Sequence, residues 1–184
     1  SAEEARPGVP QPLIRPGLPV VLPDFVISRL TVSLFNAFFY GIHSSQPARK
    51  IEHPETFFYP LDAIRNWNRL YGSRGFTQYQ CVIPEAAGPD GVKSFLNLLR
   101  RTGGSSMLSV IKDCGPVSEA YLSFPVEGTT LALDLPYRGA ATEALVHELD
   151  ARVIASGGRI YLAKDAVTRA EDFARMMPRL GEWK

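Results

Sequence analysis

Two hydrophobic patterns alternate along the chain from Thr77 to Met177, and each suits a different kind of backbone. Runs rich in β-branched and aromatic residues, which favour strands, occur at 77–83, 107–112, 120–124, 129–135 and 159–163. Between them, apolar residues recur every three or four positions, as in helices with one buried face, at 90–101, 140–156 and from 170 onward. The alternation predicts an α+β fold, in which two helices cover one face of an antiparallel sheet in the ferredoxin-like manner.

Glycines and polar caps divide these segments from one another. Gly128 separates the fourth predicted strand from the third, so we expect a hairpin between 120–124 and 129–135. The run Thr168-Arg169-Ala170-Glu171 has the spacing of a capping box and predicts the start of the last helix. Phe173, Met176 and Met177 should then face inward.

The first part of the chain has a different composition. Six prolines between Ser1 and Pro23 favour an extended arm or linker over residues 1–23. Leu30, Leu34 and Phe38 follow at helical spacing, and we expect this short helix, which would end at Gly41, to bury its aromatic face in the core. A second short helix is predicted from residue 63 to residue 71.

Composition limits the possible class of protein. With 184 residues, 45% of them hydrophobic, the chain can bury one core, and its net charge of +1 gives no strong field to attract nucleic acid. Cys81 and Cys114 lack the spacing of a zinc site or a disulfide framework, so we expect reduced thiols in the cytoplasm. No apolar run approaches the roughly 20 residues that cross a bilayer. The chain begins with Ser1 and ends at Lys184 without a capping motif, from which we expect a piece of a longer protein.

Five short motifs occur in a specific order along the chain. They are Tyr59-Pro60-Leu61-Asp62, Trp67-Asn68-Arg69, Gln78-Tyr79-Gln80 with Val82-Ile83-Pro84, Ser123-Phe124-Pro125 and Tyr161-Leu162-Ala163-Lys164-Asp165. Together they resemble the FAD-linked oxidases of the vanillyl-alcohol-oxidase-like superfamily, and among these the decaprenylphosphoryl-ribose oxidase type. Each motif is weak alone, but the ordered set at compatible spacing is fairly specific.

The resemblance implies a division of labour between two domains. In such flavoproteins an N-terminal domain binds FAD, and a second domain covers the isoalloxazine ring and shapes the substrate pocket. This chain would supply the second, as a substrate-binding domain over 24–158, while 159–184 would return towards the FAD domain. That domain is absent from the sequence, and we expect the chain alone to be inactive and to leave FAD unbound.

The resemblance also implies roles for three residues. Lys164 stands where the family has a lysine close to flavin and substrate, so it is the candidate catalytic and cofactor-binding cation. Lys112 matches a lysine of the substrate pocket. Ala132 stands where mycobacterial members carry a cysteine, which alters one wall of the pocket. The alternatives are a surface Lys164 paired with Asp165 and an edge-strand Lys112 that discourages strand pairing.

Four further candidates follow from side-chain chemistry. Gln78 and Gln80 alternate along a strand, so both amides face one side and can bind sugar hydroxyls, although a solvated sheet face has the same pattern. Tyr59 and Tyr161 can stack on a sugar or donate a hydrogen bond, and Tyr161 lies near Lys164 as a second cofactor contact; the alternative is a core aromatic. Asp134, before Leu135-Pro136, is interpreted as the cap of a turn.

Two hypotheses of function follow. In the first, the parent protein is an FAD-dependent enzyme that oxidises a sugar, a sugar alcohol or a related alcohol, with the FAD domain of the same chain and a partner reductase as its partners. In the second, the chain is a stand-alone ferredoxin-like module that binds a ligand or a protein without catalysis. The near-neutral charge disfavours a nucleic-acid partner.

Overall fold

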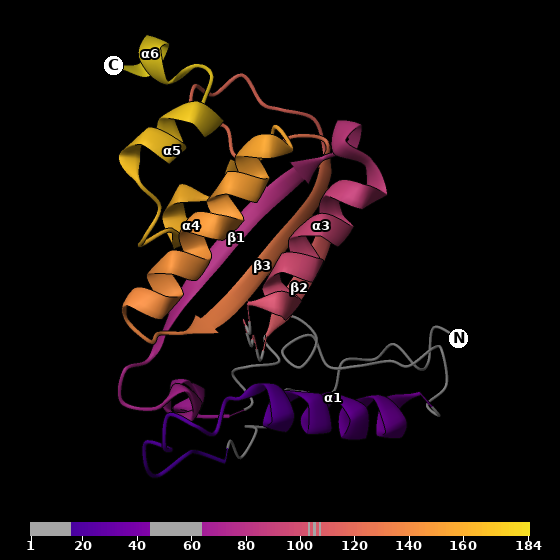
Figure 1. Ribbon diagram of the computed structural model, residues 1–184, viewed down its shortest axis with the longest axis vertical. Coiled ribbons are helices and arrows are strands. Elements are labelled where there is room, and N and C mark those ends of the chain that lie inside the picture. The colour runs from indigo at the N-terminus through magenta and orange to yellow at the C-terminus, as the bar shows by residue number, and fades with distance from the viewer. Residues whose placement is uncertain (1–15, 45–63, 103, 105, 107) are drawn as a thin grey trace, which may run out of the picture.

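A computed structural model describes residues 16–44, 64–102, 104, 106 and 108–184, and it has an α+β fold around one antiparallel sheet (Figure 1). The sheet has four strands in the order β2-β3-β1-β4. The strands are β1 (Phe76–Pro84), β2 (Ser109–Cys114), β3 (Gly128–Pro136) and β4 (Arg159–Ile160). The predicted class is therefore confirmed. The element order is β-α-β-β-α-β, one strand fewer than the five-strand order from which a ferredoxin-like arrangement was predicted.

The two central strands form the longest ladder of the sheet. β1 pairs with β3 without a break, from Phe76 opposite Pro136 to Pro84 opposite Gly128. β2 pairs with the other edge of β3, and β4 pairs with β1. Because successive side chains alternate between the faces of a strand, this register assigns every side chain of β1 and β3 to one face or the other.

Two helices cover one face of the sheet (Figure 1). They are α3 (Gly88–Arg101) and α4 (Ala140–Ala155), and both match their predicted extents closely. The core beneath them contains side chains from both central strands and both helices: Tyr79, Cys81, Ile83, Phe95, Leu99, Leu131, Leu133, Leu135, Val146, Leu149 and Val153.

The end of the chain packs against α4 and β4. A 3₁₀ turn, η4 (Leu162–Lys164), follows β4 and leads into α5 (Ala170–Met176) and a last turn, α6 (Leu180–Trp183). Met176 and Met177 are buried, as predicted. The predicted capping box is wrong, because Arg169 stands at the N-cap without a side-chain cap and Asp165 accepts from the amides of Val167 and Thr168.

Two strand predictions are wrong in extent or in kind. Residues 120–122 form a bend and a turn, residues 123–124 have no regular secondary structure, and no hairpin with β3 exists at Gly128. The reason is that β1 and β2 already pair with both edges of β3, so a further strand has no edge to join. The run predicted as a strand at 159–163 is a strand only over Arg159–Ile160, because the backbone turns at η4.

The described part of the proline-rich arm lies beside residues 65–69. Leu18 donates its amide to the Arg65 carbonyl at 3.0 Å, and Leu22 does the same to Arg69. The Arg69 guanidinium donates in turn to the carbonyls of Leu18 and Pro19. Instead of the helix predicted for 63–71, the described residues there form a 3₁₀ turn, η2 (Trp67–Tyr71), which ends at Gly72. The domain boundaries at residues 23 and 158 remain predictions.

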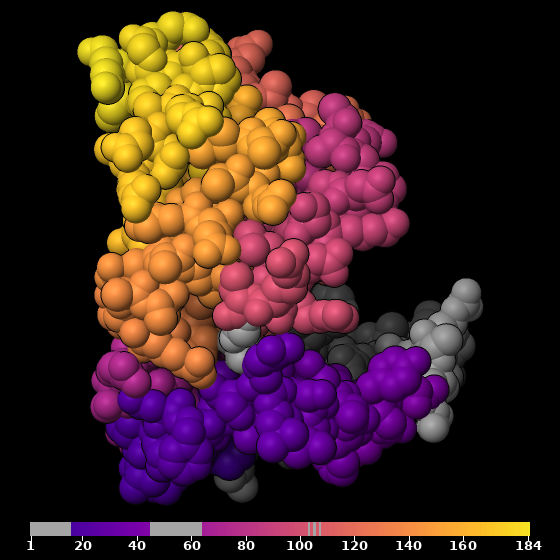
Figure 2. Space-filling view, in the orientation of Figure 1, coloured from indigo at the N-terminus to yellow at the C-terminus, as the bar shows by residue number. Residues whose placement is uncertain are grey.

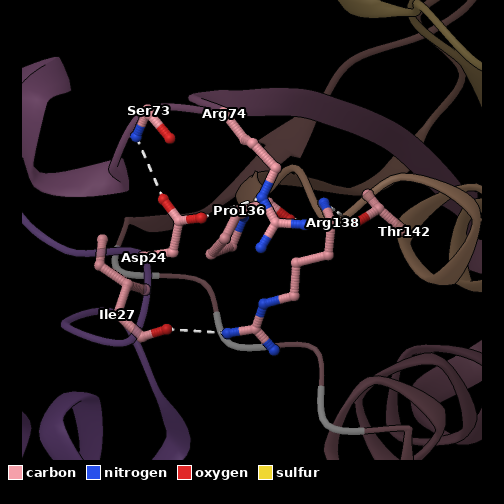
Figure 3. A network of polar contacts seen from close by, with 7 residues as sticks. All are labelled: Asp24, Ile27, Ser73, Arg74, Pro136, Arg138 and Thr142. Carbon is pink, nitrogen blue, oxygen red and sulfur yellow. Dashed lines mark hydrogen bonds and ion pairs between the residues drawn. The ribbon is translucent and has the colours of Figure 1, made fainter.

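A second set of contacts fastens this segment to the end of the sheet (Figure 3). The Asp24 carboxylate accepts from the Ser73 amide at 3.1 Å and pairs with the Arg74 guanidinium at 2.9 Å. The guanidinium of Arg138, just after β3, donates to the carbonyl oxygen of Ile27. The residue Ile27 is buried. Thr142, at the start of α4, accepts from the Arg138 amide and donates to Pro136. The contacts hold residues 24–27 against the ends of β1 and β3.

The helix α1 (Arg29–His43) follows directly, with Ser28 and Thr31 forming a capping box at its start. The prediction that its aromatic face lies in the core is wrong, because none of its side chains is buried. α3 and α4 already cover the apolar face of the sheet, so no core surface is left for α1. Within the part of the chain that is described, no helix combines the length and the apolar character needed to cross a membrane.

Candidate functional site

The sheet face opposite α3 and α4 carries most of the polar strand residues. Tyr79 and Cys81 point towards the helices, so Gln78 and Gln80 point the other way. In the register, Gln78 lies opposite Asp134 and Gln80 lies opposite Ala132. We call this surface the open face.

Strand β2 extends the open face to one edge of the sheet. Lys112 lies opposite Thr130, and the Thr130 hydroxyl accepts from the Gln80 amide at 3.2 Å, so Lys112 shares this face. Its side chain is exposed. Gln78, Gln80, Ala132 and Lys112 are therefore brought to one surface.

Tyr161 and Lys164 lie at the opposite edge. The Tyr161 amide donates to the Gln80 carbonyl at 2.8 Å, which continues the β1–β4 pairing and brings Tyr161 beside Gln80. Lys164 ends the η4 turn and is partly buried. The neighbouring Asp165 is used by the backbone of the following loop, where it accepts from two amides. With strands about 4.8 Å apart, Lys112 and Tyr161 are separated by roughly 14 Å across the face.

Asp134 is the residue whose importance the sequence interpretation missed. It is a strand residue on the open face, two positions before the end of β3, and not the cap of a turn. Only 3% of its surface is exposed. One carboxylate oxygen, Oδ1, accepts from the Gln78 amide at 3.0 Å, while the other, Oδ2, has no hydrogen-bond partner among the described residues. A buried acceptor without a partner is uncommon and marks a place where a donor can bind.

The electrostatic surroundings of Asp134 combine two opposing effects. Burial raises the pKa of its carboxyl, and the hydrogen bond from Gln78 and the positive charge of Lys164 lower it. The charge of Lys164 is thus near enough to favour the ionised form of Asp134, though less than the hydrogen bond from Gln78 does. The Tyr71 phenol, also buried, has a raised pKa, first because of burial and then because of Asp134, so it stays protonated as a potential donor.

An apolar recess of about 500 Å³ adjoins Gln80 and Tyr161. Its walls come from the loop after β2, the segment after β4 and α5, and include Leu122, Phe124, Pro125, Leu162 and Met177. The Phe124 and Tyr161 rings lie 4.9 Å apart between centroids. Polar groups on the open face and an apolar recess at its edge together suit a ligand that has both characters.

The structure separates the candidates into three groups. Gln78 contacts Asp134, and Gln80 and Ala132 lie beside this pair on the same face. Tyr161 lies next to Gln80 at the β4 edge, and Lys164 follows in η4. Lys112 shares the face but lies at the far edge. Tyr59 lies outside the described residues, so its role remains a prediction. The sequence signal that could have identified Asp134 is its position in the strand. Thr130, Ala132 and Asp134 occupy every second position of β3, so all three lie on the same face as Gln78.

The described residues contain no group of three or more histidine, cysteine or acidic side chains able to hold a metal ion. The donors and acceptors of the open face are amides, a carboxylate, ammonium groups and phenols. Such groups bind hydroxyl-rich molecules through hydrogen bonds.

Comparison with known proteins gives an independent indication of ancestry. No protein-family model matches the chain. Decaprenylphosphoryl-beta-D-ribose oxidase of Mycolicibacterium smegmatis is 40% identical over 166 residues, which are 90% of this chain and 35% of that protein. A Streptomyces coelicolor protein described as an uncharacterized protein in the mprA 5' region is 30% identical over 98% of this chain and 48% of its own length.

The chain thus spans between about a third and a half of the length of these relatives. The five motifs are short strings, and the similarity to an oxidase extends along nearly the whole chain. The two observations point to the same class of protein and therefore support each other. The resemblance of this chain to the FAD-linked oxidases of the decaprenylphosphoryl-ribose type is therefore confirmed, over 90% of its length.

Proposed function

We propose that this chain is the substrate-binding portion of an FAD-dependent enzyme that oxidises the CH–OH group of a sugar, a sugar alcohol or a related alcohol. The observation that carries the proposal is the unpaired Oδ2 of buried Asp134, whose Oδ1 is held by Gln78 on the open face. A free acceptor among amide groups is suited to a substrate hydroxyl. The similarity to decaprenylphosphoryl-beta-D-ribose oxidase supports the same class of substrate.

In this proposal the residues of the open face bind and orient the alcohol. Asp134 Oδ2 accepts a hydrogen bond from one hydroxyl, and Gln78 holds the carboxylate in position through Oδ1. Gln80 and Tyr161 contact further hydroxyls, and Lys112 binds a more distant polar group such as a phosphate. The apolar recess next to Tyr161 receives a non-polar part of the substrate.

Oxidation removes a hydride from carbon and a proton from oxygen. FAD, held mainly by another domain of the same parent chain, supplies the hydride acceptor. In this proposal Lys164 would stabilise the negative charge that develops on the oxygen as the hydroxyl proton passes to solvent. Tyr161 and Lys164, at the edge of the sheet, are the residues of this chain that would face the cofactor.

Further proposals concern the size of the pocket, the location of the protein in the cell and a partner enzyme. Ala132, which lies between Gln80 on β1 and Val110 on β2, is smaller than a cysteine, so this part of the face leaves more room. The cytoplasmic location expected from Cys81 and Cys114 remains a proposal. A partner reductase that returns the oxidised carbon to an alcohol of opposite configuration remains an expectation.

The test is an absorbance spectrum of the purified full-length parent, followed by anaerobic titration with sugars, sugar alcohols and their phosphates. We expect flavin bands that one substrate class bleaches. Lys164→Ala should slow the bleaching at least about tenfold, because a charge-stabilising group is lost. Asp134→Asn should raise the substrate concentration for half-reduction about tenfold, which corresponds to one charged hydrogen bond.

Lys93→Ala is the matched control, since Lys93 is an exposed lysine of α3 paired with Asp90 on the helix-covered side. It should behave as the unmodified parent does. A colourless but folded parent would contradict the proposal and favour a ligand-binding module without catalysis. Reduction of the Asp134→Asn variant at unchanged substrate concentration would remove Asp134 from the site.

A further inference from the structure

The outer edge of β2 carries backbone groups that the sheet leaves unpaired. β2 is an outer strand of the sheet and pairs only with β3 among the described strands. The Asp134 amide donates to the carbonyl of Leu108, directly before β2, so these two residues form a hydrogen-bonded pair. Such pairs recur at every second residue, and the amide and carbonyl groups of Ser109, Ile111 and Asp113 therefore point away from β3. Within the described chain, no other segment donates to these groups or accepts from them.

Two of these residues also direct their side chains to the helix-covered side of the sheet. Ile111 lies opposite Leu131, and Asp113 lies opposite Thr129. Leu131 belongs to the core beneath α3 and α4, so Ile111 and Asp113 share that face. Ile111 is nevertheless 58% exposed. In Figures 1 and 2, α3 borders the molecule on this side, whereas α5 lies beyond α4 on the opposite side. The outer edge of β2 is therefore open in both its backbone and its side chains.

A cavity of about 860 Å³ lies between this edge and the start of α3. Its apolar walls include Ile83 and Pro84 from β1, Val92 from α3 and Ile111 from β2. A further strand beside β2 would direct every second side chain towards this cavity, because neighbouring strands share their two faces. The cavity therefore has the position and the lining to receive an apolar side chain from an extended segment.

The charge around the cavity indicates what kind of segment fits. Three exposed acidic residues border it: Asp113 near the end of β2, and Glu85 and Glu127 where β1 ends and β3 begins. Lys93 of α3 borders it as well, but pairs with Asp90 at 3.5 Å. None of the three carboxylates forms an ion pair with another described residue. The border of the cavity is thus negative and complementary to a cationic side chain.

We propose that the outer edge of β2 binds an extended, basic segment of a partner protein, which joins the sheet as a fifth strand. The segment places a β-branched residue opposite Ile111 and an arginine or lysine opposite Asp113, two positions apart on one face. Hydrogen bonds to the outward backbone groups supply affinity, and the apolar and charged contacts supply specificity. Lys112 lies on the open face, away from the cavity, and does not oppose the cation there. The inference is independent of the proposed oxidation.

The test is binding of a labelled peptide, Arg-Thr-Val-Thr-Arg-Thr-Val, to the intact chain, measured by fluorescence anisotropy. A comparison peptide has glutamate in place of both arginines. We expect the arginine peptide to bind at least about tenfold more tightly, because its cations meet the carboxylates that repel the glutamates. Amide exchange followed by NMR should slow at Ile111 and Asp113 when this peptide is added. It should stay unchanged at Val110 and Lys112, whose amides already bond to β3.

Two variants separate the backbone contribution from the charge. Ile111→Pro removes an outward amide and should weaken binding at least about tenfold, whereas Ile111→Val keeps the amide and should bind within about twofold of the unmodified chain. Asp113→Asn/Glu127→Gln should reduce the preference for the arginine peptide about tenfold. Glu171→Gln is the charge control and should change nothing, since Glu171 is an exposed residue of α5, which packs at the β4 edge. Circular dichroism checks that each variant folds, and if Ile111→Pro does not, the charge variant and the exchange data decide the question.

Other occupants of this edge give different results. If light scattering shows a dimer without peptide, Ile111→Pro is monomeric and neither peptide binds, the edge belongs to a contact between two copies and the proposal is wrong. If the amides of Ile111 and Asp113 already exchange slowly in the full-length parent, the parent's own chain occupies the edge and the proposal is wrong as well. Equal affinity for the two peptides, or unchanged exchange at Ile111 and Asp113, would also overturn it.

Discussion

Two buried aspartates lie on opposite faces of the sheet, and their surroundings differ. Asp134 is on the open face beside Gln78 and Lys164. Asp150 is on α4 under the helix layer, fully buried, where the Tyr79 hydroxyl donates to its Oδ1 at 2.8 Å. Burial raises the pKa of Asp150 to about 6, against the opposing effect of the Tyr79 hydrogen bond.

We predict that Asp150 makes the stability of the protein depend on pH. Between its ordinary pKa of 3.8 and about 6, the folded protein holds the proton more tightly than the unfolded chain. The free energy of unfolding therefore falls as the pH rises through this interval and is level above it. Relative to Asp150→Asn, whose amide does not ionise, the unmodified protein should lose roughly 2 kcal/mol between pH 4 and pH 7.

Urea unfolding at a series of pH values measures this difference. Asp90→Asn is the matched control, since Asp90 is a highly exposed residue of α3 in a surface pair with Lys93. The plot of its free energy of unfolding against pH should stay parallel to that of the unmodified protein. If the Asp150→Asn curve is parallel as well, Asp150 titrates normally in the folded protein.

At the level of single elements, the end of the β1–β3 ladder depends on one glycine. Gly128 begins β3 opposite Pro84, with a φ of 152°, which only glycine adopts easily. A Cβ there would overlap the carbonyl oxygen of Ile83 and the backbone nitrogen of Glu85. The strand can therefore start at this position only because the side chain is missing.

Gly128→Ala should lower the free energy of unfolding by about 2 kcal/mol or more, because both the dihedral angle and the contacts oppose a side chain. Denaturant unfolding monitored by circular dichroism gives the value. Gly115→Ala serves as the comparison, since a Cβ at Gly115 meets nothing within 4 Å. A loss of similar size in both variants would show that the close approach at Gly128 can relax.

The molecule as a whole has two parts of unequal packing. The sheet with α3 and α4 has a continuous core, which includes Phe95, Leu149 and Val153, each with 0% of its surface exposed. α1 has no buried side chain and is held mainly through the segment before it. Local opening needs less free energy where few apolar side chains are buried.

Hydrogen exchange of the intact chain should reveal this difference. We predict that amides in the middle of α4 exchange only with global unfolding, whereas those of α1 exchange at least about a hundred times faster. Mass spectrometry of peptides from the two helices measures both in one experiment. Equal protection of α1 and α4 would mean that α1 unfolds together with the core.

Local patterns in the sequence determine much of the fold. Strand and helix periods identify β1, β3, α3 and α4 to within about two residues, because each pattern reflects which side of its own element is buried. Alternation along a strand also places Gln78 and Gln80 together on one face. The order and spacing of the five motifs are enough to indicate the relationship to FAD-linked oxidases, because such strings are carried by the sequence itself.

Three features depended on neighbours far away in the sequence. Residues 120–124 resemble a strand but are not one, because β1 and β2 occupy both edges of β3. The apolar side of α1 resembles a core surface, but α3 and α4 already cover the sheet. Asp134 has an unpaired oxygen because Gln78, its neighbour across the ladder, satisfies only the other one. The sequence period therefore determines which side of a helix or strand is apolar, because it depends only on neighbouring residues. The tertiary structure decides whether another element packs against that side, because this depends on residues far away in the sequence.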